Sequence, residues 1–89
     1  MLKKEVEIIN KLGLHARASG KFSQLANQYE CEVWVSKGDK TINGKSIMGL
    51  MMLAASMGST VEIKTFGIDE EAAMNALCNL IEEKFGEGE

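Results

Sequence analysis

The residues best suited to chemistry lie in the pentapeptide Gly13-Leu14-His15-Ala16-Arg17, which contains the only histidine of the chain. The apolar pattern that follows predicts a helix from about Ala16, so His15 stands at the start of that helix. The first amides of a helix have no intrahelical partner and carry a positive partial charge, which favours a bound anion. We expect an imidazole held at this end to stay neutral and therefore nucleophilic.

Arg17 adds a planar set of donors that matches the oxygens of a phosphate. The stretch thus offers a nucleophile, an anion-binding backbone and a cation within three positions, and a phosphoryl group is the ligand that uses all three. The pentapeptide alone leaves a second interpretation open, because short motifs also occur by chance. In that interpretation His15 only caps the helix and Arg17 is ordinary surface charge.

Charge is distributed unevenly along the chain, although the net charge is only −3. Residues 1–45 contain eight Lys or Arg and five Asp or Glu, whereas residues 46–89 contain two and eight. Positions 10–29 contain no acid, and three cations surround His15 there: Lys11, Arg17 and Lys21. A positive field at this place would attract an acidic or phosphorylated partner. The acidic pI of about 5.2 argues against nucleic acid as that partner.

Length and composition indicate an ordinary globular protein with a single domain over residues 1–89. Apolar residues make up 45% and charged residues 26% of the chain. No apolar run resembles a membrane span or a signal peptide, so we expect a cytoplasmic location without membrane insertion. Cys31 and Cys78 form no CxxC pair and are joined by no second histidine, which predicts two buried apolar side chains and no metal site.

Alternating apolar residues predict four strands, at Leu2–Ile9, Cys31–Lys37, Lys40–Ile42 and Thr60–Phe66. Three helices are predicted from periodic apolar stripes. The first stripe is Phe22, Leu25, Ala26 and Tyr29. The third helix opens with the acids Asp69, Glu70 and Glu71, and its stripe is Ala73, Ala76, Leu77, Leu80 and Ile81. We expect Gly86–Glu89 to be a frayed acidic tail.

The second helix, which follows Ser46, carries more apolar surface than one stripe requires. The predicted buried stripe is Ile47, Leu50, Met51 and Ala54. This leaves Met48 and Met52 outside it, with Gly49 between them. Flexible methionines beside a small residue suit a surface that binds several partners, although they could equally fill an irregular core. Ser46 is a suitable N-cap.

The order strand, helix, strand, strand, helix, strand, helix predicts an α+β fold of two layers. Three helices would cover one face of a mixed or antiparallel four-stranded sheet, and the other face would be open to water. A ferredoxin-like sheet with an added helix shares the first six elements. The element order alone does not separate the two folds.

The chain resembles the HPr family, the phosphocarrier proteins of the bacterial phosphoenolpyruvate-dependent phosphotransferase system. The resemblance extends over nearly all 89 residues. It rests on the element order and on two motifs, the pentapeptide around His15 and Lys45-Ser46-Ile47-Met48-Gly49-Leu50. It implies an HPr-like open-faced two-layer sandwich with an antiparallel sheet and the order βαββαβα.

The resemblance also implies a function for His15. This residue would accept a phosphoryl group on a ring nitrogen from phosphorylated Enzyme I and pass it to an EIIA-type protein, in sugar uptake or its regulation. The amide of Ala16 and the side chain of Arg17 would stabilise the phosphate. The chain would then be a stoichiometric phosphocarrier rather than a free-standing catalyst, and it would need no metal or other cofactor.

A second implication concerns Ser46, which HPr kinase/phosphorylase modifies in relatives with a Ser-Ile-Met sequence. A phosphate at a helix N-terminus need not unfold the protein, but it would place nearly two negative charges beside the docking surface and weaken binding to an acidic Enzyme I. The implied docking surface is Lys21, Ile47, Met48, Gly49, Met51 and Met52. A transcription regulator is a further candidate partner, and we expect a monomer.

One position departs from the family pattern, because Ala18 stands where most relatives have proline after the arginine. Alanine is the best helix former, so the helix should survive with a less rigid first turn. The branch of the family stays open at this point. A nitrogen-related regulatory carrier of the NPr type is one alternative, and a non-catalytic ferredoxin-like binding module with an incidental His15 is another.

Overall fold

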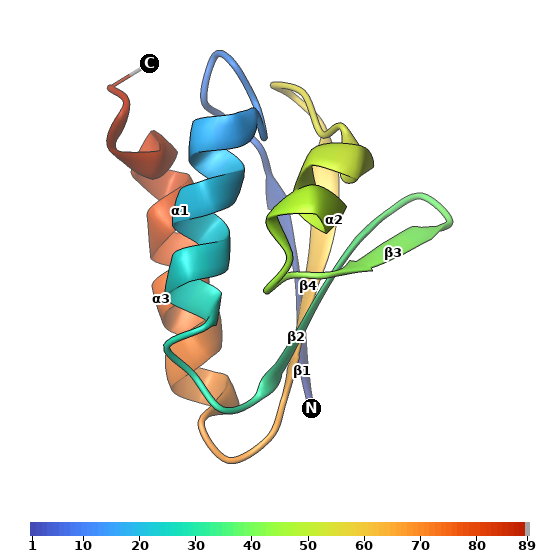
Figure 1. The fold of residues 1–89 in the computed structure, drawn as a ribbon, viewed down its shortest axis with the longest axis vertical. Coiled ribbons are helices and arrows are strands. Elements are labelled where there is room, and N and C mark those ends of the chain that lie inside the picture. The colour runs from blue at the N-terminus through green and yellow to red at the C-terminus, as the bar shows by residue number, and fades with distance from the viewer. Residues whose placement is uncertain (89) are drawn as a thin grey trace.

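Four strands form one antiparallel sheet in the order β1-β4-β2-β3 (Figure 1). The computed structural model describes residues 1–88. The strands are β1 (Leu2–Glu7), β2 (Glu32–Lys37), β3 (Lys40–Asn43) and β4 (Thr60–Phe66). The last strand, β4, therefore lies in the interior of the sheet and pairs with both β1 and β2. Of the two predicted arrangements, mixed and antiparallel, the antiparallel one is correct.

Three helices cover one face of this sheet, as the element order predicted (Figure 1). They are α1 (Ala16–Ala26), α2 (Ile47–Leu53) and α3 (Glu70–Glu82), and a 3₁₀ turn, η1 (Lys84–Gly86), follows α3. No helix within residues 1–88 is long and apolar enough to cross a membrane. The face of the sheet that lacks helices carries Trp34, whose indole donates a hydrogen bond to Glu32 at 3.0 Å.

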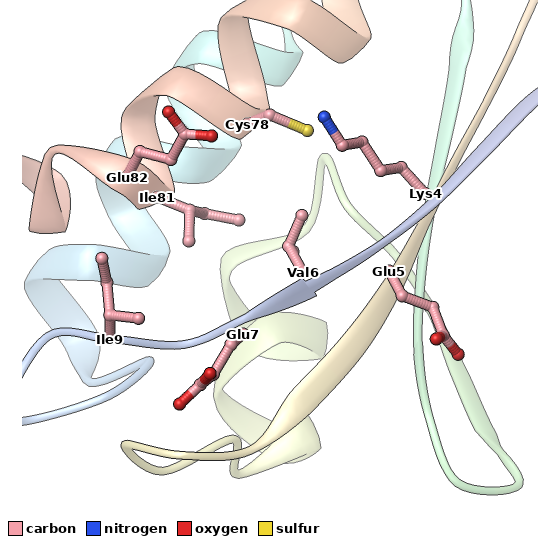
Figure 2. A pocket seen from close by; sticks show the side chains of 8 residues that line it. All are labelled: Lys4, Glu5, Val6, Glu7, Ile9, Cys78, Ile81 and Glu82. Atoms are coloured by element: carbon pink, nitrogen blue, oxygen red, sulfur yellow. The ribbon is translucent and has the colours of Figure 1, made fainter.

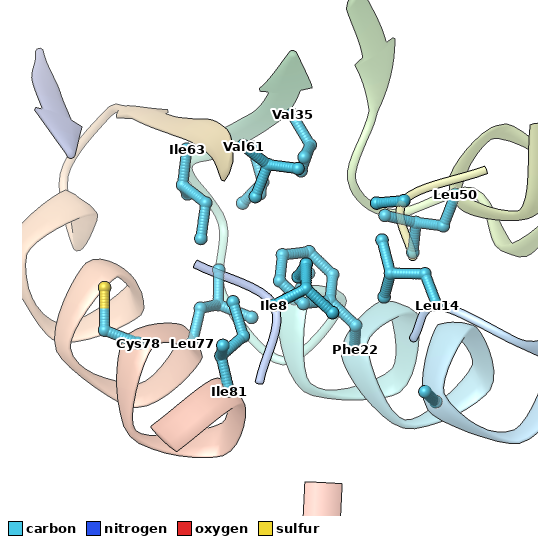
Figure 3. Packing of buried hydrophobic residues seen from close by; sticks show 14 of the residues in the cluster. Ile8, Leu14, Phe22, Val35, Leu50, Val61, Ile63, Leu77, Cys78 and Ile81 are labelled. Carbon is cyan, nitrogen blue, oxygen red and sulfur yellow. The ribbon is translucent and has the colours of Figure 1, made fainter. Parts of the chain in front are cut away.

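The core lies between the helices and the sheet, where side chains from all layers meet (Figure 3). The fully or almost fully buried residues include Ile8, Phe22, Val35, Leu50, Val61, Ile63, Leu77 and Ile81. Cys31 and Cys78 are free and buried, as predicted from their spacing. Burial raises the pKa of the Cys31 thiol to about 11, so this residue behaves as a small apolar side chain at neutral pH.

The predicted buried stripe of α2 is wrong. Only Leu50 and Leu53 are buried, whereas Ile47 and Met51 are 46% and 43% exposed. The reason is the length of the helix, which has only seven residues and ends where Ala54 adopts a left-handed conformation. Two leucines spaced three residues apart are enough to pack such a short helix against the core.

The acids Asp69, Glu70 and Glu71 lie at the N-terminus of α3, as predicted, with Asp69 as the N-cap residue. The carboxylate of Asp69 makes no capping hydrogen bond. Instead it accepts hydrogen bonds from the amides of Glu30 and Cys31, each at 2.9 Å. Asp69 therefore ties the start of α3 to the loop that precedes β2.

These hydrogen bonds make a pH-dependent contribution to stability. The bond from the Glu30 amide is the main cause that lowers the pKa of Asp69 below its ordinary value of 3.8. A group with a lowered folded-state pKa stabilises the protein above its ordinary pKa, and this contribution is lost as the pH falls through the folded-state value. Asp69→Asn should therefore lower the urea midpoint at pH 7, and its effect should shrink as the pH falls from 3.8 toward and below the folded-state pKa. Asp39→Asn, an exposed carboxylate in a turn, is the control, and an equal deficit at both pH values would contradict the assignment.

The predicted frayed tail is wrong for Gly86 and Glu87, and Glu89 lies outside the described residues. After α3 the chain folds back, and Phe85 enters the core with 1% exposure. Lys21 donates from Nζ to the carbonyl of Phe85 at 2.6 Å. Lys84 and Phe85 both have a φ of +56°, a left-handed conformation that costs about 1–2 kcal/mol per residue. Burial of the Phe85 ring offsets this cost and holds the turn in place.

Phe85→Ala should therefore destabilise the fold by about 3 kcal/mol, because it leaves a cavity in the core and removes the anchor of the turn. Urea unfolding monitored by circular dichroism measures this loss. Phe66→Ala is the matched control, since Phe66 is 56% exposed on the open face of the sheet. Similar losses for the two variants would show that the Phe85 ring does not hold the turn.

Candidate functional site

His15 is the N-cap of α1, the position that the sequence predicted for it. Its backbone is extended, and its Nδ1 accepts a hydrogen bond from the amide of Arg17 at 3.2 Å. The carbonyl of the same residue accepts the first bond of the helix, from the amide of Ser19 at 2.8 Å. The imidazole is thus turned over the positive end of α1 and keeps 26% of its side chain exposed.

The other ring nitrogen of His15 contacts the C-terminal segment. Nε2 donates a hydrogen bond to Oε2 of Glu87, whose side chain is only 11% exposed. The second oxygen, Oε1, accepts a hydrogen bond from Nδ2 of Asn10 at 3.0 Å. Burial opposes ionisation of this carboxyl, but the hydrogen bonds from Asn10 and His15 outweigh it and lower the pKa of Glu87 below its ordinary 4.5.

Together these contacts assign the tautomer of the imidazole. Nδ1 accepts from an N–H group and therefore carries a lone pair, whereas Nε2 faces a carboxylate and carries the proton. The nitrogen with the lone pair is also the nitrogen that lies at the helix N-terminus. A group attached to it would meet the free amides at the start of α1, which include that of Ala16.

The loop that presents His15 is held from both sides. Gly13 has a φ of +67°, and a Cβ at this position would lie 2.5 Å from the carbonyl oxygen of Ala55. The next residue, Leu14, is buried and donates from its amide to the same carbonyl at 2.9 Å. The loop is therefore pinned to the segment directly after α2, and only glycine fits at position 13.

The first turn of α1 forms without the proline that the family pattern has after the arginine. Ala18 is fully buried, and Arg17 is exposed beside His15. The prediction that alanine preserves the helix is confirmed, because α1 begins at Ala16. The guanidinium of Arg17 is close enough to contribute to the lowered pKa of Glu87.

Ser46 is the N-cap of α2, as predicted, and its Oγ accepts a hydrogen bond from the amide of Gly49 at 3.0 Å. The apolar side chains that follow are exposed, and we call them the α2 apolar face: Ile47, Met48, Met51 and Met52. Met48 and Met52 are the most exposed of the four, at 68% and 65%. Gly49 is partly buried against Ile42.

Lys21, the remaining residue of the predicted docking surface, is placed differently. It lies on α1, is partly buried, and donates to the carbonyl of Phe85. Sequence reasoning missed both Asn10 and Glu87. No local signal could have found Glu87, because it lies 72 positions from His15 along the chain.

The site lies apart from the cavity between β1 and α3, which has a volume of about 290 Å³. Figure 2 shows this cavity, with Lys4 pointing toward Cys78 and with Ile81 and Glu82 on the helix side. Burial raises the pKa of the Cys78 thiol, so the cavity offers no reactive thiolate at neutral pH. Within residues 1–88 no group of three side chains could hold a metal ion.

Comparison with known proteins connects this geometry to a family. The family model described as "PTS HPr component phosphorylation site" matches residues 2–83. The phosphocarrier protein HPr of Neisseria meningitidis is 64% identical over 89 residues, which is 100% of both chains. A phosphocarrier protein NPr from Shewanella violacea is 42% identical over 86 residues and covers 97% of this chain and 94% of its own.

A solved structure shows the same fold. A crystal structure of HPr-C-His from Thermoanaerobacter tengcongensis matches with a TM-score of 0.95 and 48% identity, over 98% of each chain. The HPr-like open-faced sandwich is thereby confirmed, and the ferredoxin-like alternative is wrong. With the family model, the full-length identity and the fold in agreement, the chain is a member of the HPr family of phosphocarrier proteins of the phosphotransferase system.

Proposed function

We propose that His15 is the residue of this carrier that is phosphorylated, and that Nδ1 is the reacting nitrogen. The observation that carries the proposal is the position of Nδ1 at the N-terminus of α1, where it accepts from the Arg17 amide. The phosphoryl donor is phosphorylated Enzyme I and the acceptor is an EIIA-type protein.

In the transfer step the lone pair of Nδ1 attacks phosphorus while the bond from phosphorus to the donor's leaving group breaks. The Arg17 amide then moves its hydrogen bond from Nδ1 to a phosphate oxygen. The amide of Ala16 and the guanidinium of Arg17 balance the remaining charge of the three equatorial oxygens. The proton on Nε2 stays in place throughout.

A carrier must also release the group it accepts, and the exposure of the site serves this purpose. His15 lies at the surface rather than in a cavity, so a second protein can approach Nδ1 from solvent. Few fixed contacts surround the phosphoryl group, which keeps its binding from becoming too tight for onward transfer.

The α2 apolar face provides the docking surface for these partners. The hydrogen bond from the Leu14 amide to the Ala55 carbonyl keeps the end of α2 next to the His15 loop. A partner bound to α2 would therefore also contact the imidazole. Exposed methionines adapt to partners of different shape. Partly exposed Lys21 adds a positive charge on α1, and an acidic Enzyme I would be attracted to this region.

Replacement of His15 tests the acceptor. Radioactive phosphoenolpyruvate and Enzyme I should label the wild type with an acid-labile group and should not label His15→Ala. Arg17→Ala should be labelled about 100-fold more slowly, because a donor to the phosphoryl oxygens is lost. Ser46→Ala serves as the control and should keep the acid-labile label. Label that persists in His15→Ala would contradict the assignment.

Ser46 is the proposed regulatory site, a substrate of HPr kinase/phosphorylase. Its hydroxyl lies at the open N-terminal end of α2, next to Ile47 and Met48. A phosphate there would leave the fold intact but would add nearly two negative charges beside the docking surface. Binding of an acidic partner would weaken as a result. A transcription regulator that recognises the phosphorylated form is a further candidate partner.

The matched pair Ser46→Asp and Ser46→Asn tests the effect of charge at this position, because both side chains cap helices well. Ser46→Asp should lower kcat/KM for transfer from Enzyme I about 10-fold, mainly through KM, and Ser46→Asn should not. Raised salt should reduce the difference. Equal values of kcat/KM for Ser46→Asp and Ser46→Asn would contradict the proposal that negative charge at position 46 weakens partner binding.

The nitrogen-related branch is the second candidate function, since the NPr of Shewanella violacea is 42% identical to this chain. The 64% identity to an HPr favours the sugar branch. Transfer rates from a sugar-branch and a nitrogen-branch Enzyme I, measured side by side, would discriminate between the two.

A further inference from the structure

We infer that Glu87 is a positioning residue for phosphoryl transfer, which keeps the proton of His15 on Nε2 and so makes Nδ1 the nucleophile. This inference rests on the proposed function of His15. It starts from an arrangement that the sequence did not predict, in which a C-terminal carboxylate lies against the ring nitrogen opposite the proposed reacting atom.

The carboxylate of Glu87 is held on both of its oxygens. Oε2 accepts from His15, and Oε1 accepts from Asn10 at 3.0 Å. The amide of Asn10 is itself oriented, because its Nδ2 also donates to the carbonyl of Gly13 at 2.8 Å and the residue is fully buried. The same buried side chain thus anchors the loop before His15 and the carboxylate beside it.

The contacts of the segment after α3 hold Glu87 beside His15. The Phe85 ring is buried, and Nζ of Lys21 holds the Phe85 carbonyl at 2.6 Å. The amide of Gly86 donates to Glu83 at 2.9 Å, and that of Glu87 donates to Lys84 at 3.0 Å. These contacts fix the backbone up to position 87 and therefore restrict where the Glu87 side chain can lie.

The chemical consequence follows from the two tautomers of a neutral imidazole. In water the proton can reside on either nitrogen, but a carboxylate at Nε2 favours the form with the proton on Nε2 and the lone pair on Nδ1. The Asp of a catalytic triad orients its histidine in the same way. Loss of the carboxylate would allow the unreactive tautomer to compete.

The carboxylate also matches the charge that the ring acquires. When the Nδ1–P bond forms, the ring holds a substituent on Nδ1 and a proton on Nε2, so it becomes a cation. Glu87 pairs with this cation, and no proton has to move. On transfer to the acceptor the Nδ1–P bond breaks, its electron pair returns to Nδ1, and the ring is neutral again. Arg17 and Lys21 are the other charged groups that face this region from α1.

Glu87→Gln tests the inference in the full-length protein, because it removes the charge and keeps the size. We expect kcat for phosphorylation by Enzyme I to fall about 10- to 100-fold with KM unchanged, since a charge-assisted hydrogen bond is lost while the docking surface stays intact. Nitrogen-15 NMR of the His15 ring should show the proton on Nε2 in the wild type and a mixture of tautomers in the variant. Glu83→Gln, an exposed glutamate four positions away, is the matched control and should behave as the wild type.

The possible outcomes separate this inference from the proposed function. If the wild type is labelled through His15 but Glu87→Gln keeps its kcat or its ring tautomer, the positioning role is overturned and the function stands. A change confined to KM would also overturn it, because it would place Glu87 in partner binding. Label that does not depend on His15 would instead remove the proposed function itself. A urea midpoint equal to that of Glu83→Gln would show that the rate loss does not come from unfolding.

Discussion

The hydrogen bond from the Arg17 amide to Nδ1 of His15 is the interaction on which the site depends. It places the imidazole at the one end of α1 where unpaired amides gather, and it does so with a nitrogen that has a lone pair to offer. A histidine elsewhere on the helix would have neither the donors nor this orientation. The proposed reactivity therefore depends on the contact between the His15 side chain and the N-terminus of α1. The rest of the fold maintains this contact.

Three segments distant in sequence converge to maintain this geometry. The loop before His15 is hydrogen-bonded to the carbonyl of Ala55, just after α2, and the turn after α3 is anchored in the core by Phe85. Each segment is anchored by a buried group, while His15 itself stays partly exposed. A rigid frame around an accessible side chain suits a protein that must meet a donor and an acceptor in turn.

Short-range patterns predicted most of the fold because strands and long helices bury one face at a fixed period. They failed at α2, where a helix of seven residues needs only Leu50 and Leu53 to bind the core and leaves Ile47 and Met51 exposed. Asp69 does lie at the N-terminus of α3 as predicted, but the pattern did not reveal that its carboxylate accepts hydrogen bonds from a different loop. In both cases the tertiary packing decided what a local pattern could not show.

The sequence by itself determined the order of the elements, the place of His15 and Ser46 at helix starts, and the proximity of Arg17, because all of these depend on neighbours within a few positions. Only the tertiary structure decided that Glu87 contacts His15. Those residues are 72 positions apart, and the C-terminal stretch is short, acidic and rich in glycine, which by composition indicates a free end. Burial of Phe85 reverses that expectation, since the free energy gained in the core outweighs the cost of an ordered left-handed turn.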